Sequence, residues 1–411
     1  MFRVKNKSKK WSRVIVSSLM AISFGCQHAP KHMTTGPVEG VIEREPASTT
    51  ASEWNEYGGI RTATRMGEKF SPISDINQAN VTSLYPVWGF HTEELDEAIA
   101  AEPKSLEITP LYQQVEMGNG TTKEMLLGCT MYNKVFALNP ETGESAWENK
   151  KFFDPKVRKS DKVWAYKCRG VSIWKDSNRN APIECKTRIL TNTIDGRLIA
   201  LDARNGELCQ DFTDRVGKEK APGHVGGQVA AWVNVARPAL SAEEREKFIR
   251  ESGVENSKVE MPVSRDEFYM TSAPLIFGDY VIVGGGIADN GRVEATSGAI
   301  QAFDVRTGEL KWFWDPAPEF RKKEAKAKGQ PLVYGTPNVW APMSADETLG
   351  MIFVPTGAAA PDYYAADRNG LDQFANSVVA LRIAEPRRAG TSGPFEMLRE
   401  PQLAWQLDRK S

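Results

Sequence analysis

The five cysteines limit the possible chemistry of this chain most directly. Cys129, Cys168, Cys185 and Cys209 form an even set, which permits disulfides in an exported chain. Three pairings are possible, and four buried free thiols are the alternative. No two cysteines have the Cys-x-x-Cys spacing, so a zinc site is not expected. The fifth, Cys26, directly follows a glycine and could become the lipid-modified first residue of a mature lipoprotein.

The first 25 residues have the composition of an export signal. Residues 1–13 carry six basic side chains and no acidic one, and the apolar run Val14–Gly25 is too short to cross a bilayer as a helix. We expect a signal peptide over 1–25, followed by lipidation of Cys26 or by ordinary cleavage to a soluble periplasmic protein. Residues 26–52 are rich in Ala, Pro, Thr and Ser, which predicts a flexible tether. A periplasmic protein with a lipid anchor in the membrane is the favoured localisation.

A repeated turn after an apolar run indicates the fold. Asn139-Pro-Glu-Thr-Gly143 and Asp304-Val-Arg-Thr-Gly308 share this pattern, and the glycine is free to adopt positive φ. In both copies a tryptophan, Trp147 or Trp312, follows four residues after the glycine. We expect the tryptophan to lie over the turn of its own hairpin. Such a hairpin is typical of a propeller blade.

Two further copies are less complete. Asp202-Ala-Arg-Asn-Gly206 has Gln210 at the tryptophan position, and the copy at Ser377–Arg382 lacks the turn but is followed by Trp405. The unequal spacing of the copies requires blades with insertions or interleaved blades without this mark. We therefore predict an all-β chain folded as a partial β-propeller over residues 53–411.

Individual strands are expected where β-branched and aromatic residues cluster. They are Val87–Phe90, Met125–Cys129, Val135–Leu138, Arg188–Asn192, Arg197–Leu201, Tyr280–Val283 and Ala299–Phe303. Residues 213–268 are polar and include a helix-like stretch at 241–250, so we interpret them as an insertion between blades. Phe320–Gly329 is interpreted as a charged surface loop, and Asn80–Leu84 as a short turn or helix.

Several short pieces, in a fixed order between Trp54 and Trp405, resemble the pyrroloquinoline-quinone (PQQ) dehydrogenases, most closely the membrane-associated glucose and quinate type. The pieces are Tyr57-Gly58, Phe70-Ser-Pro72, Cys168-Arg-Gly-Val171, Asp195-Gly-Arg-Leu-Ile-Ala-Leu-Asp202, Asp289-Asn290, Thr336-Pro-Asn-Val-Trp340, Val354-Pro-Thr-Gly357 and Pro361-Asp362. The resemblance implies an eight-bladed propeller that holds PQQ and a divalent metal on its axis. This chain would contain about the first half of those blades.

The resemblance also implies roles for individual residues at the cofactor. PQQ has three carboxylates and an electrophilic ortho-quinone, so its site needs cations, hydroxyl donors and a stacking plane. Arg169 matches the family's arginine that faces carboxylate and quinone, and guanidinium is a natural bidentate partner for such groups. Glu107 matches an acid that accepts from the cofactor, and Thr193 matches a hydroxyl donor. Trp340 matches the ring on which PQQ stacks, and Ala288 is placed in the same site.

The implied metal site consists of oxygen ligands, which calcium and magnesium prefer. Asp289 falls at the family's metal-ligand carboxylate, Asn290 supplies a neighbouring amide oxygen, and Asp362 is a weaker candidate. Taken singly, these residues have simpler explanations: Asp289-Asn290-Gly291 as a turn, Arg169 as a surface ion pair and Trp340 as a core residue. Their occurrence together favours the cofactor site.

Three departures from the family pattern bear on activity. Ala165 stands where close relatives have a histidine, and Ala360 stands where they often have a polar residue. In the family, the strand that corresponds to Trp405 leads into the stretch with the catalytic aspartate, whereas Gln406–Ser411 follows it here. We therefore assign no catalytic residue and expect the family's base, with the later blades, beyond Ser411. A second chain that supplies those blades is a partner to consider.

The combined prediction is a PQQ-dependent dehydrogenase that oxidises a sugar, polyol or cyclic alcohol of the glucose or quinate type and passes electrons to ubiquinone. This chain alone is expected to be inactive. The alternative is a non-enzymatic periplasmic propeller lipoprotein that acts as a protein-binding scaffold, and a fragment without a stable fold is a third interpretation. The charge is balanced, with 52 basic and 53 acidic residues, so a nucleic-acid partner is not expected.

Overall fold

Strands make up nearly all of the regular structure, as the β-branched and aromatic runs predict. The computed structural model describes residues 54–59, 74–94, 104–149, 166–193, 197–212, 230–232, 268–290, 293, 295–329, 332–386 and 396–408. All of these belong to one of two units, Ile42–Ser411. The expected signal peptide, Cys26 and the tether at 26–52 lie outside the described residues. Within the described ranges, no helix is both long enough and apolar enough to span a membrane.

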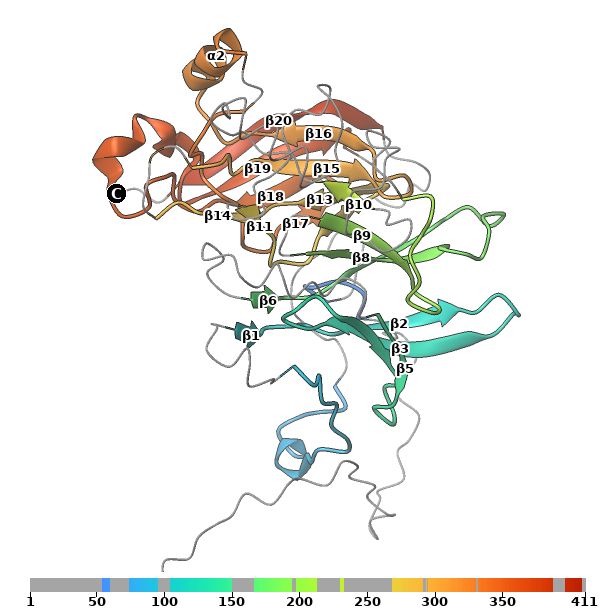
Figure 1. The fold of residues 1–411 in the computed structure, drawn as a ribbon. Helices are drawn as coiled ribbons and strands as arrows, with labels where there is room; N and C mark the ends of the chain where they lie inside the picture. The colour runs from blue at the N-terminus through green and yellow to red at the C-terminus, as the bar shows by residue number, and fades with distance from the viewer. Residues whose placement is uncertain are drawn as a thin grey trace, which may run out of the picture. The chain divides into compact units, whose positions relative to one another are not determined.

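Four antiparallel sheets of four strands each follow one another along the described part of the chain (Figure 1). Blade A contains β2 (Leu111–Glu116), β3 (Thr122–Cys129), β4 (Val135–Leu138) and β5 (Ser145–Asn149). Blade B contains β7 (Ser172–Lys175), β8 (Thr187–Asn192), β9 (Arg197–Asp202) and β10 (Ala230–Trp232). Blade C contains β12 (Leu275–Phe277), β13 (Tyr280–Val283), β15 (Ile300–Asp304) and β16 (Leu310–Trp314). Blade D contains β17 (Ser344–Asp346), β18 (Met351–Pro355), β19 (Ser377–Ala384) and β20 (Met397–Asp408).

Two sheets of two strands each are formed by segments outside the four blade sheets. Strands β1 (Lys104–Leu106) and β6 (Tyr166–Cys168) pair in parallel, and β11 (Phe268–Tyr269) and β14 (Gly286–Ile287) pair antiparallel. Each of these pairs joins segments that come from different parts of the chain. They matter for function because Glu107, Arg169 and Asp289 follow β1, β6 and β14, respectively.

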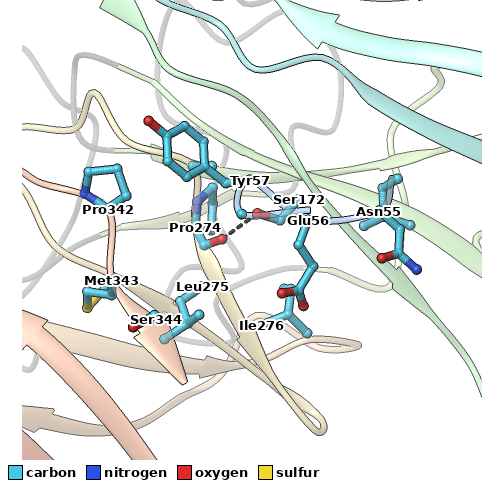
Figure 2. Close-up of a pocket in the computed structure, with 13 residues that line it drawn as sticks. Asn55, Glu56, Tyr57, Ser172, Pro274, Leu275, Ile276, Pro342, Met343 and Ser344 are labelled. Carbon is cyan, nitrogen blue, oxygen red and sulfur yellow. Dashed lines mark hydrogen bonds between the residues drawn. The ribbon is translucent and has the colours of Figure 1, made fainter. Parts of the chain in front are cut away.

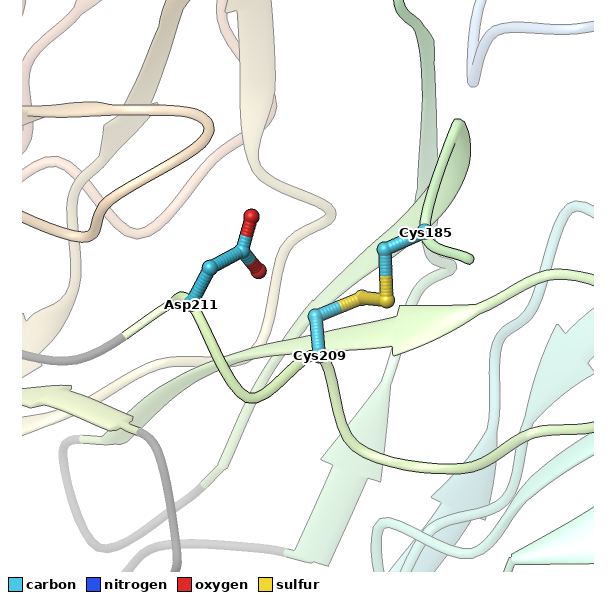
Figure 3. Close-up of side chains that lie close together, drawn as sticks. All are labelled: Cys185, Cys209 and Asp211. Atoms are coloured by element: carbon cyan, nitrogen blue, oxygen red, sulfur yellow. A yellow bond between two sulfur atoms is a disulfide. The ribbon is translucent and has the colours of Figure 1, made fainter. Parts of the chain in front are cut away.

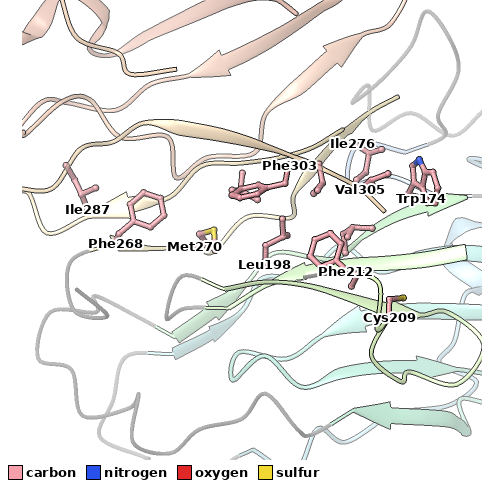
Figure 4. Close-up of a cluster of buried hydrophobic side chains, with 14 of the residues drawn as sticks. Trp174, Leu198, Cys209, Phe212, Phe268, Met270, Ile276, Ile287, Phe303 and Val305 are labelled. Atoms are coloured by element: carbon pink, nitrogen blue, oxygen red, sulfur yellow. The ribbon is translucent and has the colours of Figure 1, made fainter. Parts of the chain in front are cut away.

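The hydrophobic core lies between successive blades. One cluster joins blade A to blade B, a second joins blade B to blade C, and a third joins blade C to blade D. Figure 4 shows the second cluster, in which Leu198 and Phe212 lie near Phe268, Ile276 and Phe303. Each fully buried side chain of this size stabilises the fold by about 1.5–3 kcal/mol. The blades are therefore held together mainly by apolar contact between their faces.

The three predicted glycine turns are confirmed. Gly143, Gly206 and Gly308 have φ angles of 71°, 73° and 72°, which favour glycine because it lacks a Cβ. The expected position of the tryptophan was wrong, because Trp147 covers the turn of the next blade. Its indole N–H donates to the carbonyl of Ala203 (3.1 Å), and a Cβ on Gly206 would lie 2.4 Å from the ring. Trp88 lies in the same way against Gly143 and donates to Pro140.

Three further sequence interpretations need correction or completion. Val87–Phe90 belongs to no strand in the described residues; it contacts blade A through Trp88. Phe320–Gly329 is mostly helix α2 (Glu319–Ala327), because Pro318 starts it and good helix formers follow. Within 213–268, strand β10 completes blade B and β11 begins at Phe268, so the segment is not only an insertion. The expected helix at 241–250 lies outside the described residues, whereas Asn80–Leu84 contains the expected short helix, Val81–Ser83.

The four cysteines beyond Cys26 form two disulfides, Cys129–Cys168 and Cys185–Cys209. The first links strand β3 of blade A to strand β6, directly before Arg169. The second closes the region around the β9 turn, next to Asp211 (Figure 3). Because both sulfurs are bonded to each other, this group of two cysteines and an aspartate is not a metal site. Asp211 instead pairs with Arg188.

Candidate cofactor and metal site

Arg169 follows strand β6 and is fixed by main-chain bonds on both sides. Its amide donates to the carbonyl of Thr271 (2.9 Å), and its carbonyl accepts from the amide of Thr109 (3.1 Å). Its guanidinium pairs with Glu107 (3.0 Å), donates to the hydroxyl of Thr271 and lies 5.2 Å from the ring centre of Trp340. Only 13% of the side chain is exposed. The structure therefore brings together three residues that the sequence placed at the cofactor: Glu107, Arg169 and Trp340.

Lys167 joins this group, although the sequence interpretation did not include it. The parallel register of β1 and β6 places Ser105 opposite Lys167, and Glu107 accepts from both side chains (2.7 and 2.6 Å). The hydrogen bond from Lys167 is the main reason why the pKa of Glu107 lies below its usual value. Alternation along a strand could have found Lys167, because it lies two residues before Arg169. We call Glu107, Lys167, Arg169, Thr271 and Trp340 the arginine cluster.

Trp340 presents an open ring. It is 47% exposed, and its carbonyl accepts from the hydroxyl of Ser272 (2.6 Å). The carbonyl of Ser272 accepts in turn from the side-chain amide of Asn192 in blade B (2.7 Å). Thr193, the next residue, is buried, and its hydroxyl accepts from the amide of Arg197 (3.1 Å). An exposed aromatic face beside a fixed guanidinium is suited to a flat anionic ligand.

The predicted metal carboxylate lies beside two other polar residues. Asp289 accepts from the side-chain amide of Asn338 (2.7 Å), and its carbonyl accepts from the amide of Asp362 (3.0 Å). Burial, with a contribution from the charge of Asp362, raises the pKa of Asp289 to about 6. Ala288 and Asn290 flank Asp289 after strand β14, and both are partly buried. We call Asp289, Asn338 and Asp362 the aspartate cluster.

Asp289 and Asp362 are two partly buried acids, and the charge of Asp362 acts against ionisation of Asp289, which favours a bound cation or a proton at this place. Tyr269 of β11 is close to both clusters. Burial and then the charge of Asp289 raise its pKa to about 12, and the charge of Arg169 opposes that increase. The sequence interpretation missed Asn338 and Tyr269, because their contacts join segments that are far apart in the chain. Asn338 alone had a usable indication, since it lies two residues before Trp340.

The structure also has a cavity of about 240 Å³ (Figure 2). Some of its lining residues are close in the sequence to residues of the arginine cluster, but none of the predicted site residues lines it. Its walls come from the first strands of blades B, C and D and from the N-terminal segment of the described chain. Ser172 donates to the carbonyl of Pro274 at its edge. The lining includes Glu56, Tyr57, Ile276, Pro342, Met343 and Ser344. The chemistry of the clusters, rather than this cavity, identifies the candidate site.

The donor sets of the two clusters differ in a way that restricts their ligands. The arginine cluster offers two cationic side chains and an open aromatic face. The aspartate cluster offers carboxylate oxygens, and the buried Asn338 Oδ1 has no hydrogen-bond partner in the part of the chain that the structure describes. A ligand that is flat and anionic, together with a hard cation, fits these two groups.

A comparison with known protein families agrees with this chemistry. The family model described as "PQQ: Glucose/ethanol/alcohol dehydrogenase, beta-propeller domain" matches residues 54–244 and 239–389. The quinoprotein glucose dehydrogenase of Escherichia coli (strain K12) is 28% identical over 343 residues, which cover 82% of this chain and 36% of the relative. The quinate/shikimate dehydrogenase (quinone) of Acinetobacter baylyi is 30% identical over 361 residues, which cover 83% and 37%.

Solved structures support the same fold. The crystal structure of quinohemoprotein alcohol dehydrogenase from Comamonas testosteroni superposes with a TM-score of 0.51 at 21% identity, over 87% of this chain and 41% of that one. At this identity the likeness shows the fold alone. The curated glucose and quinate relatives described above are matched over 36% and 37% of their own length. The family model spans most of the chain, and the protein therefore belongs to the PQQ-dependent glucose/ethanol/alcohol dehydrogenase β-propeller family.

Proposed function

We propose that this chain provides part of a PQQ site in a dehydrogenase that oxidises a sugar, polyol or cyclic alcohol. The observation that carries the proposal is Arg169, which is fixed between Glu107 and the open ring of Trp340 in a chain of this family. The relatives are named as glucose, quinate and glycerol dehydrogenases, so an alcohol or sugar is the substrate class that we propose. The choice among these substrates depends on residues that contact the substrate itself.

The residues of the two clusters fit PQQ and its metal in type and charge. Arg169 and Lys167 would bind its carboxylates or quinone oxygens, and Trp340 would stack against its ring system. Asp289 and Asn290, with Asp362 as the weaker candidate, would hold calcium or magnesium. The raised pKa of Asp289 supports this assignment, because a partly buried acid beside a second acid is stabilised by a cation. When bound, PQQ supplies an electrophilic quinone that accepts hydride from the alcohol carbon.

The other residues of the proposed site position the residues that would bind the cofactor. Glu107 keeps Arg169 and Lys167 in position, because it pairs with both. Thr271 fixes the direction of the guanidinium through its hydroxyl. Thr193 and Ala288 belong to the proposed site through the family resemblance and through their position next to Asn192 and Asp289. Ubiquinone is the proposed electron acceptor, and the name of the Acinetobacter relative, which includes "quinone", supports it.

We propose export to the periplasm and a lipid anchor at Cys26 on the basis of the N-terminal sequence. Replacement of Cys26 by Ser should release the protein into the soluble fraction of cells, since the lipid is the only membrane attachment in this proposal. Continued membrane association of the Cys26→Ser variant would contradict the anchor. Globomycin-type inhibition of lipoprotein processing provides an independent check on the wild-type chain.

A further blade is the protein partner that we propose for blade D. Trp405 pairs with Ala380 in the same register in which Trp147 pairs with Ala137. Trp147 is covered by a turn of the next blade, whereas Trp405 is 45% exposed. Val378 and Leu407, which pair with each other beside it, are also exposed. A blade with an Asn/Asp-x-x-x-Gly turn is therefore the structure that this face would accept.

The test of the cofactor proposal is PQQ binding by the purified full chain. Quenching of tryptophan fluorescence should report PQQ binding that increases with calcium or magnesium. Arg169→Ala should weaken it about 10- to 100-fold, because bonds to charged groups contribute about 1.5–3 kcal/mol each. Arg382→Ala is the matched control, since Arg382 donates to the carbonyl of Leu349 on the surface of blade D. Equal affinity of the Arg169→Ala and wild-type chains would contradict the proposed site.

A further inference from the structure

The segment Thr336–Trp340 connects the two clusters, because it carries Asn338 of one and Trp340 of the other. Two glycines from other segments let the backbone of this segment approach closely. A Cβ on Gly298 would lie 2.1 Å from the carbonyl oxygen of Pro337, and one on Gly284 would lie 2.5 Å from that of Val339. Real Cβ atoms do not approach this closely, so no other residue type fits without movement of the segment. The backbone of this segment is therefore confined on two sides.

Two main-chain hydrogen bonds also hold the segment Thr336–Trp340 in place. The amide of Val339 donates to the carbonyl of Gly285 (3.1 Å), and the carbonyl of Asn338 accepts from the amide of Gly357 (2.7 Å). Gly357 also contacts the side chain, because a Cβ there would lie 2.8 Å from Asn338 Oδ1. The position of Asn338 is thus set by its backbone and by its surroundings together.

The side-chain amide of Asn338 is satisfied at one end only. It is 4% exposed, its Nδ2 donates to Asp289 Oδ2 (2.7 Å), and its buried Oδ1 has no hydrogen-bond partner among the described residues. The opposite orientation of the amide would place Oδ1 against a carboxylate oxygen, which is repulsive. A buried acceptor without a partner destabilises the fold and calls for an explanation in a native site.

We propose that Asn338 is a positioning residue that fixes the direction of the Asp289 carboxylate toward the cation. The donor bond to Oδ2 sets the plane of the carboxylate and with it the direction of Oδ1. Because Trp340 lies two residues further along the same confined segment, the cation ligand and the stacking ring keep a constant relation. Asn338 takes no part in the chemistry itself. The inference rests on the proposed function, in which Asp289 holds the metal.

A general property of metal sites gives the expected size of the effect. Groups that hydrogen-bond to metal ligands orient them, and loss of such a group typically lowers metal affinity 10- to 100-fold. Asn338→Leu keeps a similar volume and removes the donor. We expect its calcium affinity in the presence of PQQ to fall about 10-fold or more. Its affinity for PQQ without metal should remain close to that of the wild type.

The experiment measures calcium binding by titration calorimetry on the full chain with saturating PQQ, and PQQ binding separately without calcium. Thr336→Val is the matched control. It removes a hydroxyl that contacts Ser297 and accepts from the amide of Gly298 in the same segment, but this hydroxyl has no bond to Asp289. An equal loss of calcium affinity in Thr336→Val and Asn338→Leu would overturn the inference, because general loosening of the segment would then explain both.

Two further variants separate the possible failures. If the wild type binds neither PQQ nor calcium, or if Asp289→Asn binds calcium like the wild type, the proposed function fails. If Asp289→Asn loses calcium while Asn338→Leu does not, only the present inference fails. Gly357→Ala keeps Asn338 but displaces its Oδ1, so it should lower calcium affinity in the same direction by a smaller factor. If Asn338→Leu does not fold, unchanged calcium affinity in Gly357→Ala contradicts the inference.

Discussion

The junction between blades A and B and the junction between blades B and C use the same turn but different anchors. At the first, the indole of Trp147 covers Gly206 and donates to Ala203. At the second, Gln210 stands where a tryptophan would be, and Arg306 of the turn itself provides the anchor. Its guanidinium pairs with Asp176 (2.9 Å) and lies 4.5 Å from the ring centre of Trp174.

The difference shows that a side chain must anchor the glycine turn to the neighbouring blade, but that this side chain can be of more than one type. Trp174 comes from the first strand of blade B and donates to the carbonyl of Gly278 (3.1 Å), so an aromatic ring reaches blade C by another route. Arg188, also from blade B, donates to the carbonyl of Arg306 (3.0 Å). The A–B junction is thus mainly aromatic packing on glycine, whereas the B–C junction combines a cation–π contact with ion pairs.

Two other tryptophans extend this comparison. Trp312 of blade C and Trp405 of blade D have the same register opposite alanine as Trp147. The indole N–H of Trp312 is buried and has no hydrogen-bond partner in the described residues, and Trp405 is 45% exposed. The sequence of blade D has no Asn/Asp-x-x-x-Gly pattern after β19, and among the described residues Trp312 has no equivalent of the Ala203 carbonyl. The tryptophan is therefore effective only where the next blade offers a matching turn.

The largest effect is expected from Gly206→Ala at the A–B junction. Gly206 has φ 73°, and a Cβ would lie 2.4 Å from the ring of Trp147. Backbone strain and overpacking together should lower the free energy of unfolding by about 3 kcal/mol. Gly329→Ala is the control, because Gly329 has φ 70° and no atom within 4 Å of a new Cβ. Urea unfolding of the control should show a decrease of about 1 kcal/mol in the free energy of unfolding. Equal decreases for the two variants would mean that the contact between Gly206 and the Trp147 ring is unimportant.

Much of this architecture follows from the sequence, because it depends on local patterns. The strand Tyr280–Val283 and the turns at Gly143, Gly206 and Gly308 agree with the expected positions. One exception is helix α2, whose Lys- and Glu-rich sequence has no apolar periodicity to distinguish it from a surface loop. The next-blade position of Trp147 was not predictable from one hairpin, since it depends on how two blades pack.

The candidate site divides in the same way. Glu107, Arg169 and Trp340 were identified from short motifs, and the structure brings them together. Lys167 and Asn338 were missed because their importance depends on the β1–β6 register and on the contact with Asp289. A motif in one sequence identifies a residue type that suits a ligand, but it does not identify the side chain from another segment that holds it.

A second prediction compares Trp147 with Trp405. Trp147→Phe keeps an aromatic ring over Gly206 but loses the hydrogen bond to the carbonyl of Ala203, which is then left without its donor. We expect a loss of about 1–2 kcal/mol in the free energy of unfolding. Trp405→Phe should cost less than about 0.5 kcal/mol, because its ring is half exposed and it packs mainly on Phe353 of its own blade. Equal decreases in the free energy of unfolding in urea would mean that the two tryptophans contribute equally to stability.

A third prediction concerns the B–C junction. Arg306→Met keeps most of the side-chain packing on Trp174 but removes the charge that pairs with Asp176 and Asp279. A third of the Arg306 side chain is exposed, so screening by solvent limits the expected loss to about 1 kcal/mol. The loss should shrink in high salt, unlike that of Gly206→Ala. Lys311→Met is the control, since its pairs with Glu309 and Asp304 lie within blade C; a loss independent of salt would argue against an ionic anchor.

The smallest expected effect is a difference between the two junctions in how their contribution to stability depends on pH. Burial alone would raise the pKa of Asp176, but hydrogen bonds from Arg306 and from the amide of Asn178 outweigh it and hold the pKa below its usual value. A native carboxyl with a lowered pKa binds fewer protons than the unfolded one, so its stabilisation is present above about pH 4 and is lost as the pH falls further. Chemical unfolding between pH 6 and pH 3 should therefore show a steeper decrease for the wild type than for Asp176→Asn. Trp147→Phe should retain the full wild-type pH dependence, because the A–B anchor carries no ionisable group. If Asp176→Asn and the wild type lose stability in parallel, the B–C junction does not depend on this ion pair.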